Sequence, residues 1–442
     1  MFFDDGRTIC KGIAAVIIIG IVLRLVIGYF LTYNYDVYHW ALTISNFEAG
    51  NGLYDVAGYY YSPVWGYILA VFAQFSELFG VGLLGERFPE LLFTEDIDVM
   101  FRNSAFVTAP ALNIAVTVMM TVFDLINMYI VFGIVRDVFG DIRKAKICAS
   151  IWFLCPFVIA VGAAGGMFDT ISVTLTLLSV YLLIKDHELL AGMLFTSAVL
   201  LKFFPVFLIF LLVAYIIVKH RDEWRPRLAK AVIGAAAMAV IILIPQMMQG
   251  HLMDCFAFLL SRATTGGDSI IDILVRYEGI IIFSIITVIQ IYLSIRFVKK
   301  DRKEVDRDFM TYMFLGALAI FVNPASPQYV LLLTPFLIIA MINRDRRLII
   351  PFAVLCIGTT IFELTPLAMD LTSIAFYTDF LPIGSWLSFF DMFSGELAGM
   401  SPIDLWAIVG GVIQYSAVVI AIALVMKQLL SKSPSQGTEQ VS

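Results

Sequence analysis

A carboxylate, a lysine and a group of tyrosines are the side chains in this sequence that suit group-transfer chemistry. Asp36 follows the first long apolar run, in "NYDVYHWALTISNFEAGNGLYDVAGYYYSPVW" at 34–65, which contains no Lys or Arg. Lys202 lies in the apolar sequence "AVLLKFFPVF". A carboxylate beside an acceptor hydroxyl can act as a general base, and a lysine can hold an anionic group as a compact point charge. Asp36 and Lys202 are candidates for these two roles; a solvated loop acid or a helix cap is the alternative for Asp36.

The composition shows which kind of protein must position these residues. Of the 442 residues, 60% are hydrophobic and 14% are charged, with a mean hydropathy of +0.91. Soluble domains are about 45–50% apolar and about 25% charged, so the sequence indicates a polytopic membrane protein. The net charge of −6 argues against nucleic acid as a partner. The five cysteines show no CxxC spacing, and we expect most of them to be buried thiols.

Apolar runs of roughly 17–25 residues predict membrane crossings. We predict an all-α polytopic membrane protein with about twelve transmembrane helices, four of which come from two pairs of shorter segments. Residues 1–427 are expected to form one integral-membrane domain, and 428–442 a short, disordered cytoplasmic tail. The predicted crossings are 12–32, 108–136, 146–163, 167–185, 189–202, 204–219, 230–248, 277–297, 309–323, 328–343, 347–365 and 403–427.

One further apolar stretch, Ser62 to Phe79, is placed by the distribution of positive charge. If this stretch is re-entrant or interfacial, 23 of the 29 Lys and Arg residues fall on one side of the membrane. If it crossed, the basic loops would be divided between both sides, against the positive-inside rule. We therefore expect cytoplasmic N- and C-termini and a long external loop at about 31–108. Asp36 lies in this loop, so the site should face the extracellular or luminal side.

Ionisable residues inside membrane crossings cost a few kcal/mol to insert, so each needs a partner or a function. Arg24 and Asp124 each lie within a predicted crossing, and an internal ion pair that holds helices in register is one interpretation. Asp169 and Lys202 are expected near the external ends of their crossings, at the level of the acidic loop. Pro205 interrupts the helix three residues after the lysine and frees backbone groups that need a cavity or neighbouring protein.

Together these segments resemble the GT-C glycosyltransferases, most closely the catalytic subunit of GPI mannosyltransferase I and its archaeal relatives. That family has an acidic Asp-x-Asp-type motif after its first span, on which Asn34 and Asp36 fall. Its Gly-x-x-x-Tyr signature is matched by Gly50 and Tyr54. Its Tyr-x-Tyr-Thr-Pro-Leu segment resembles "YYYSPVW", which contains Tyr61.

The likeness continues along most of residues 12–345. Asp124 falls on an Asp-Leu-Leu of the family and Asp169 on an Ala-Asp-Ser. The sequence "LLKFFPV", which contains Lys202, resembles His-x-Lys-x-Tyr-Pro-Val, and "SPQYVLLLTP" resembles a Ser-Gln-Tyr-Phe segment. Two departures are plain: an asparagine replaces the first aspartate of the Asp-x-Asp motif, and a leucine replaces the family histidine before the lysine.

The resemblance implies a membrane glycosyltransferase that moves a hexose, with mannose as the expected sugar, from a polyprenyl (dolichyl) phosphate donor. The acceptor would be a lipid-linked species or a glycan. Asp36 would be the catalytic base in an inverting transfer, and Lys202 would bind the donor phosphate. The expected substrate-binding residues are Asn34, Tyr61, Asp169, Gln328 and Tyr329, and the residues with structural or secondary roles are Arg24, Asp124 and Tyr54.

No obligatory metal or cofactor is expected, because an Asn-x-Asp pair has one charged oxygen ligand fewer than Asp-x-Asp. A divalent cation is the alternative. The expected partners are the lipid-linked donor, the acceptor and membrane lipids, and the resemblance leaves room for a small membrane partner subunit.

Two competing functions follow from the same composition. A secondary transporter of a small polar or lipid-linked solute would also carry ionisable residues in the membrane, but near its midplane and between repeats. Here the candidate residues are expected near one leaflet. A non-catalytic scaffold would need no convergent polar residues at all.

Overall fold

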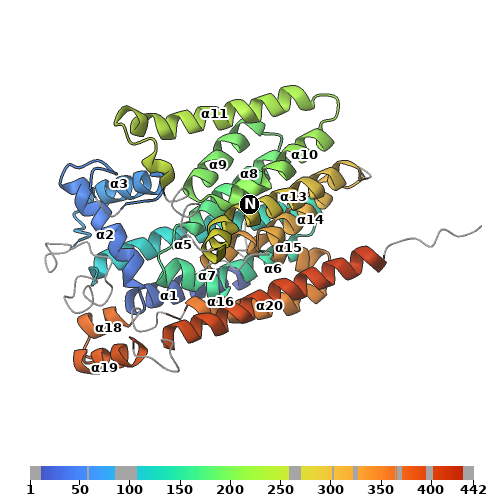
Figure 1. Ribbon diagram of the computed structural model, residues 1–442. Helices are drawn as coiled ribbons and strands as arrows, with labels where there is room; N and C mark the ends of the chain where they lie inside the picture. Colours follow the sequence, from blue (N-terminus) through green and yellow to red (C-terminus); the bar gives the residue numbers. More distant parts are fainter. Residues whose placement is uncertain are drawn as a thin grey trace, which may run out of the picture.

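The computed structural model describes residues 11–56, 59–84, 107–257, 270–300, 303–321, 327–363, 365, 371–394 and 402–431. Over these ranges the regular secondary structure is helical, and no β-strand occurs in them (Figure 1). Part of the predicted external loop 31–108 and residues 432–442 of the predicted tail lie outside the described residues.

Short turns join many of the described helices. In the first half of the described chain they are α1 (Lys11–Phe30), α2 (Asn34–Glu48), α3 (Pro63–Leu78), α5 (Pro110–Phe139), α6 (Ile142–Phe153), α7 (Pro156–Ile159), the π-helix η1 (Ala160–Ala164), α8 (Asp169–Ile184), α9 (Glu188–Leu201), the 3₁₀-helix η2 (Phe204–Leu208) and α10 (Ile209–Lys219). In the second half they are α11 (Trp224–Met248), η3 (Asp254–Phe256), α13 (Ile270–Val298), α14 (Val305–Ile320), η4 (Pro327–Leu332), α15 (Thr334–Asn343), η5 (Arg346–Leu348), α16 (Ile349–Glu363), α18 (Thr372–Tyr377), α19 (Ile383–Ser394) and α20 (Pro402–Ser431).

Several of these helices are long and apolar enough to cross a membrane. Within the described residues five qualify by themselves, namely Gly12–Phe30, Pro110–Phe139, Trp224–Met248, Gly279–Val298 and Asp404–Lys427. A sixth candidate is the pair Ile142–Phe153 and Pro156–Ala164, which bends by 52° at its break. The chain is therefore a polytopic helical membrane protein. The shorter apolar helices coincide with other predicted crossings, and the total of twelve stays a prediction.

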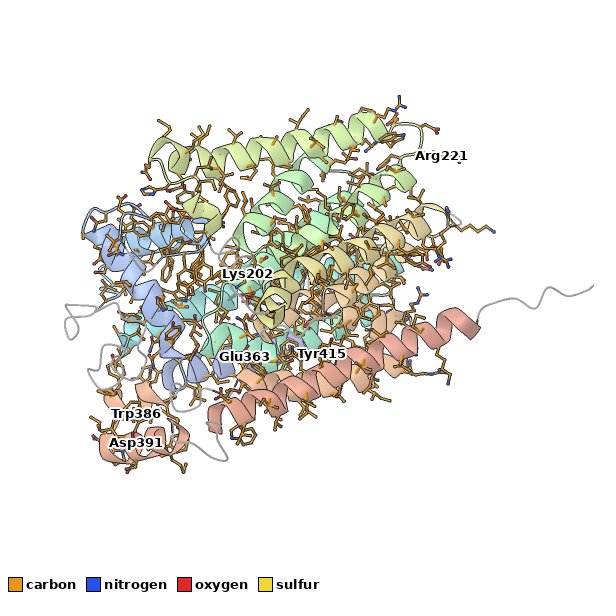
Figure 2. The ribbon with its side chains drawn as sticks, in the orientation of Figure 1. Lys202, Arg221, Glu363, Trp386, Asp391 and Tyr415 are labelled. Carbon is orange, nitrogen blue, oxygen red and sulfur yellow. The ribbon has the colours of Figure 1, made fainter. Side chains whose placement is uncertain are left out.

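The two ends of the helix bundle differ in the elements that they carry. Helices α2, α3, α18 and α19 gather at one end, on the left of Figure 1, and we call this the α2 end. The turns α5–α6, α8–α9, α10–α11 and α15–α16 make the other end, where many of the Lys and Arg residues lie, and we call it the basic end. Figure 2 labels Arg221 at the basic end and Asp391 of α19 at the α2 end.

The described part of the predicted external loop contains two helices. α2 has 15 residues, and α3 has 16. A 16-residue helix is about 24 Å long, which is less than the about 30 Å of a bilayer core. One face of α3 exposes the large apolar side chains of Val71, Phe75 and Leu78. Its length and apolar face fit a helix that enters or lies on the membrane, which remains a prediction.

Helix α16 is fixed in position by close packing along α20 (Figure 1). Glycines at the crossing let the two backbones approach, as small residues do between membrane helices. A Cβ atom at Gly410 of α20 would lie 2.7 Å from the backbone nitrogen of Phe362, and one at Gly358 would collide with the backbone of Gln414. This packing holds the C-terminal end of α16, where Glu363 lies.

Candidate active site

Asp36 lies in the first turn of α2, where the helix dipole favours a carboxylate. The start of the helix is anchored because the backbone N–H of Tyr33 donates to the carbonyl of Ala164 in η1 at 2.7 Å. Asp36 is only 7% exposed, and within the described residues its carboxylate has no hydrogen-bond or ion-pair partner. Burial raises the pKa of Asp36 to about 7, the charge of Lys202 lowers it, and the charge of Asp169 raises it. Asp36 is thus a buried carboxylate that is poised to take up a proton.

Asn34 precedes Asp36 by two residues and is completely buried. The hydroxyl of Thr108 lies 2.8 Å from its Oδ1, and its Nδ2 donates to the hydroxyl of Ser373 at 3.4 Å. Asn113 of α5 reaches the same serine hydroxyl at 3.3 Å. These bonds tie the start of α2 to α5 and α18, so Asn34 helps to position Asp36. Its direct contact with substrate stays a prediction.

Asp169 begins α8, directly after an irregular connection from the π-helix η1. This connection turns at Gly166, whose φ of +58° lies in the left-handed region that favours glycine. The space there is also tight, because a Cβ atom would lie 3.1 Å from side-chain carbons of Val37 and Val116. The indole N–H of Trp40 donates to the carbonyl of Gly166 at 3.2 Å. The turn therefore fixes the start of α8 against α2 and α5.

Lys202 is the C-cap of α9 and has an extended backbone, with φ −146° and ψ 127°. Its Nζ lies 2.9 Å from Oδ2 of Asp169. It also lies 4.4 Å from the ring centroid of Phe168, 4.9 Å from that of Tyr329 and 5.8 Å from that of Tyr61. Such cation–π contacts are strongest when they are shielded from water. The ammonium is thus held by one carboxylate and three aromatic rings, beside the charge of Asp36.

Tyr61 and Tyr329, two of the predicted substrate-binding residues, come from distant parts of the chain to this lysine. Tyr61 is placed by Tyr54, whose hydroxyl donates to the carbonyl of Tyr61 at 2.7 Å. Tyr329 lies in η4, where its ring centroid is 4.4 Å from that of Phe204. Gln328, the preceding residue, is half-buried, and no contact joins its side chain to the lysine among the described residues. The structure therefore brings Tyr61 and Tyr329 together and leaves Gln328 beside them.

Arg24 and Asp124 form an ion pair between α1 and α5, with Nη2 and Oδ2 2.9 Å apart. The guanidinium also donates to the carbonyls of Gly20 at 3.2 Å and Phe153 at 2.9 Å. Both residues are completely buried. The pair joins α1, α5 and α6 and has no contact with the Lys202 cluster, which favours a structural role.

The candidate site has a further acidic neighbour, Glu363, which our sequence analysis missed. It is the one acidic residue in the apolar segment 347–365, and it ends α16. The negative charges of Asp36 and Asp169 both act on its carboxylate. A search of every predicted crossing for ionisable residues would have found Glu363, but nothing in its local sequence shows that it lies near Asp36.

A metal site is indicated only weakly in the described part of the chain. The one group with suitably close ligand atoms there is Asp186, Glu188 and His220, at the basic end. Lys219 already lies 2.8 Å from the carboxylate of Asp186, and Arg227 lies 2.6 Å from that of Glu188. These cations neutralise the carboxylates, so we assign no metal centre to this group.

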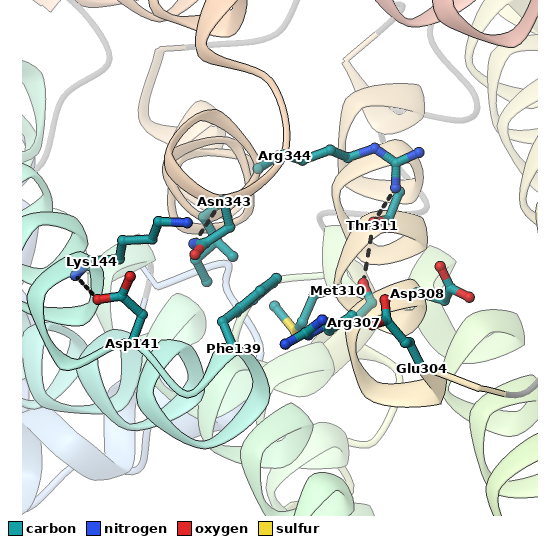
Figure 3. Close-up of a pocket in the computed structure, with 12 residues that line it drawn as sticks. Phe139, Asp141, Lys144, Glu304, Arg307, Asp308, Met310, Thr311, Asn343 and Arg344 are labelled. Carbon is teal, nitrogen blue, oxygen red and sulfur yellow. Dashed lines mark hydrogen bonds and ion pairs between the residues drawn. The ribbon is translucent and has the colours of Figure 1, made fainter. Parts of the chain in front are cut away.

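A polar pocket of 310 Å³ lies at the basic end, between the ends of α5, α6, α14 and α15 (Figure 3). In Figure 3, Arg344 extends from α15 towards Thr311 of α14, and its guanidinium donates to that hydroxyl at 2.6 Å. None of the residues predicted to take part in catalysis or substrate binding lines this pocket. It is therefore separate from the cluster around Asp36 and Lys202.

Comparison with known protein families relates part of the chain to one of them. The model of the family described as dolichyl-phosphate-mannose-protein mannosyltransferase matches residues 109–248. No curated protein matches the chain significantly. The matched region contains Asp124, Asp169 and Lys202, whereas Asp36 precedes it and Glu363 follows it. Because the match covers a minority of the chain, it supports the wider grouping, a membrane glycosyltransferase of the GT-C superfamily.

Proposed function

We propose that this protein transfers a hexose, mannose by our expectation, from a polyprenyl-phosphate donor to a hydroxyl group of a lipid-linked or glycan acceptor. The observation that carries the proposal is the carboxylate of Asp36, which is buried and has no partner among the described residues, beside the ion pair of Lys202 and Asp169. A carboxylate without a partner is costly to bury, so it is a candidate functional group. The family match over residues 109–248 supports the same class of reaction.

The proposed chemistry is a single displacement at the anomeric carbon of the donor sugar. The acceptor oxygen attacks that carbon while Asp36 takes the hydroxyl proton. The bond between the anomeric carbon and the phosphate oxygen breaks, and the phosphate leaves with the electron pair. Because one bond forms as the other breaks from the opposite face, the configuration at the anomeric carbon is inverted. The phosphate is a stable anion, so the reaction needs one base and no separate acid.

Lys202 is suited to stabilise the phosphate as negative charge develops on its leaving oxygen. An ammonium has three N–H donors, and Asp169 accepts one of them at 2.9 Å. The remaining donors are available for phosphate oxygens. The rings of Tyr61, Phe168 and Tyr329 surround the ammonium and shield it from water, which strengthens its interaction with an anion. Asp169 acts in this scheme by holding the lysine in place.

The proposed partners follow from the same scheme. The polyprenyl chain of the donor would lie in the membrane, with its phosphate at Lys202 and its sugar between Lys202 and the α2 end of the bundle. We propose that this end faces the extracellular or luminal side, because the opposite end carries many of the basic residues. This scheme requires no metal. A divalent cation or a small membrane partner subunit can be tested by adding it to the transfer assay.

Transfer in detergent tests this proposal. Purified protein is incubated with a radiolabelled polyprenyl-phosphate hexose and a membrane lipid extract as the acceptor source. We expect labelled product whose formation depends on active protein. A transporter cannot move solute across a membrane in detergent and would form no product. Failure to form product with all polyprenyl-phosphate hexoses, with and without divalent cations, would refute the proposed function.

A further inference from the structure

Glu363 occupies a position from which it can act on the proposed site. It is the last residue of α16, which packs along α20 on one side and contacts α7, η1 and η4 on another. The elements η1 and η4 lead to Asp169 and carry Tyr329, respectively. Figure 2 labels Glu363 and Lys202 in the interior of the bundle, away from both ends. Helix α16 thus brings a carboxylate from the C-terminal part of the chain to the site.

The carboxylate of Glu363 is not fully satisfied by the described part of the protein. Its Oε1 is buried and has no hydrogen-bond partner among the described residues. The charges that act on it, those of Asp36 and Asp169, are both negative, and no described cation counters them. Asp36 is likewise buried and without a partner in the described chain. Two carboxylates that lack a partner in the described chain therefore face one site, whose lysine is already engaged by Asp169.

The chemistry of these groups limits the ligand that could satisfy Glu363. An anionic group is disfavoured, because three carboxylates act on one another here. A metal ion needs ligand atoms that converge, and the one convergent group in the described residues lies elsewhere. A neutral group with several hydroxyl donors fits best, since a carboxylate accepts hydrogen bonds with both of its oxygens. Sugar rings carry such hydroxyls on adjacent carbons.

We propose that Glu363 is a specificity-determining residue that accepts hydrogen bonds from hydroxyl groups of the transferred sugar. This inference rests on the proposed function. In that scheme Asp36 faces the acceptor oxygen, and Asp169 holds the lysine that binds the phosphate. The sugar ring lies between the acceptor oxygen and the phosphate during the reaction. Glu363 interacts with the charges of both Asp36 and Asp169, so it would lie beside the ring.

Deoxy-sugar donors test the contact directly. The parent polyprenyl-phosphate hexose and a series of donors that each lack one ring hydroxyl are compared in wild type and Glu363→Ala. In the wild type, removal of the contacted hydroxyl should lower kcat/KM by at least about tenfold, because it leaves a buried carboxylate oxygen unpaired. In Glu363→Ala the same deletion should cost less than about twofold, because no carboxylate is left unpaired.

Stability provides a second readout, which separates binding from a structural role. Glu363→Gln should melt at the same temperature as the wild type or higher, because it removes an unpaired buried charge. A structural residue would instead lower the melting temperature and slow all donors equally. Glu77→Gln, at an exposed position of α3, is the matched control and should change neither readout.

The outcomes also separate this inference from the proposed function. If the wild type transfers the parent sugar, but each deoxy donor loses as much kcat/KM in Glu363→Ala as in the wild type, this inference alone is overturned. A fall in the melting temperature of Glu363→Gln would overturn it as well. Absence of transfer from every donor by the wild type would overturn the proposed function, and this inference with it.

Discussion

The pH dependence of sugar transfer should follow the ionisation of Asp36. A general base must be deprotonated to accept a proton, and burial raises the pKa of this carboxyl from its ordinary value of 3.8 to about 7. For a single group of that pKa, about one tenth is ionised at pH 6 and about one hundredth at pH 5. We therefore expect kcat/KM to fall about tenfold from its plateau at pH 6 and about a hundredfold at pH 5. Above pH 8 it should be constant.

The charges around Asp36 predict how its titration moves when they are changed. The groups that act on it are Lys202 and Asp169, with Glu363 and the half-buried Tyr61 also facing it. Asp169→Asn removes a negative charge that raises the pKa of Asp36, so the midpoint of the profile should move to lower pH. Lys202→Met removes a positive charge that lowers this pKa, so the midpoint should move to higher pH.

Steady-state kinetics of hexose transfer in detergent, from pH 5 to pH 9, would measure these profiles. The phosphodiester of the donor does not titrate in this range, so the profile reports on the protein. A flat kcat/KM between pH 5 and pH 7 would refute the assignment of the base. A midpoint that moves in the same direction in Asp169→Asn and Lys202→Met would refute the electrostatic reasoning.

The same shift in pKa predicts a change in stability. The folded protein holds the proton of Asp36 more tightly than the unfolded chain does, because the folded pKa is the higher of the two. Its contribution to stability is therefore complete below pH 3.8 and is lost as the pH rises towards about 7. Asp36→Asn should then be at least as stable as the wild type at pH 8, which thermal denaturation would show.

Three further predictions address the lysine, the internal ion pair and the topology. Lys202→Ala should raise the donor KM and lower the rate. Lys202→Arg should restore both only in part, because a planar guanidinium replaces a compact ammonium. Normal kinetics in both variants would leave Lys202 a structural partner of Asp169. Arg24→Met should destabilise the protein by about 3–5 kcal/mol in equilibrium unfolding, since it leaves Asp124 buried and unpaired, and Arg24→Met with Asp124→Leu should recover most of this loss. Unchanged stability in Arg24→Met would contradict the structural role of the pair. Cysteines introduced at Asn51 and Ser435 should react with impermeant reagents from opposite sides of the membrane, and labelling from the same side would rule out the predicted topology.

The sequence predicts the helices well because each of them must bury or expose a long apolar surface. Every predicted crossing coincides with a helix or a pair of short helices in the described residues. Whether a helix crosses depends on how the bilayer surrounds it. The segment after α1 shows a further limit of prediction from the sequence. Its tyrosines and acidic residues indicate a loop at the membrane surface, whereas its residues 34–48 form a helix that packs on α5.

The site is predicted in part. Placing Asp36, Asp169 and Lys202 at one level follows from counting helices, and the structure brings their charges together. The sequence does not predict that Lys202 pairs with Asp169, because this contact depends on the turn at Gly166 and on the extended backbone of the lysine. Glu363 was missed for a related reason. It is 327 positions from Asp36 in the sequence, and the packing of α16 against α20, α7, η1 and η4 brings it to the site.

The most direct test of the central claim compares Asp36→Asn with Asp55→Asn in the transfer assay. Asp55 lies near Asp36 in the sequence but is exposed, and its carboxylate contacts the backbone N–H of Gly52 at 2.7 Å and His251 at 3.0 Å. Asp36→Asn keeps the size of the side chain but removes the base, so turnover should fall by at least about a hundredfold with donor binding and melting temperature retained. Asp55→Asn should keep most of the activity. Full activity in Asp36→Asn, or loss of activity confined to Asp55→Asn, would contradict the account.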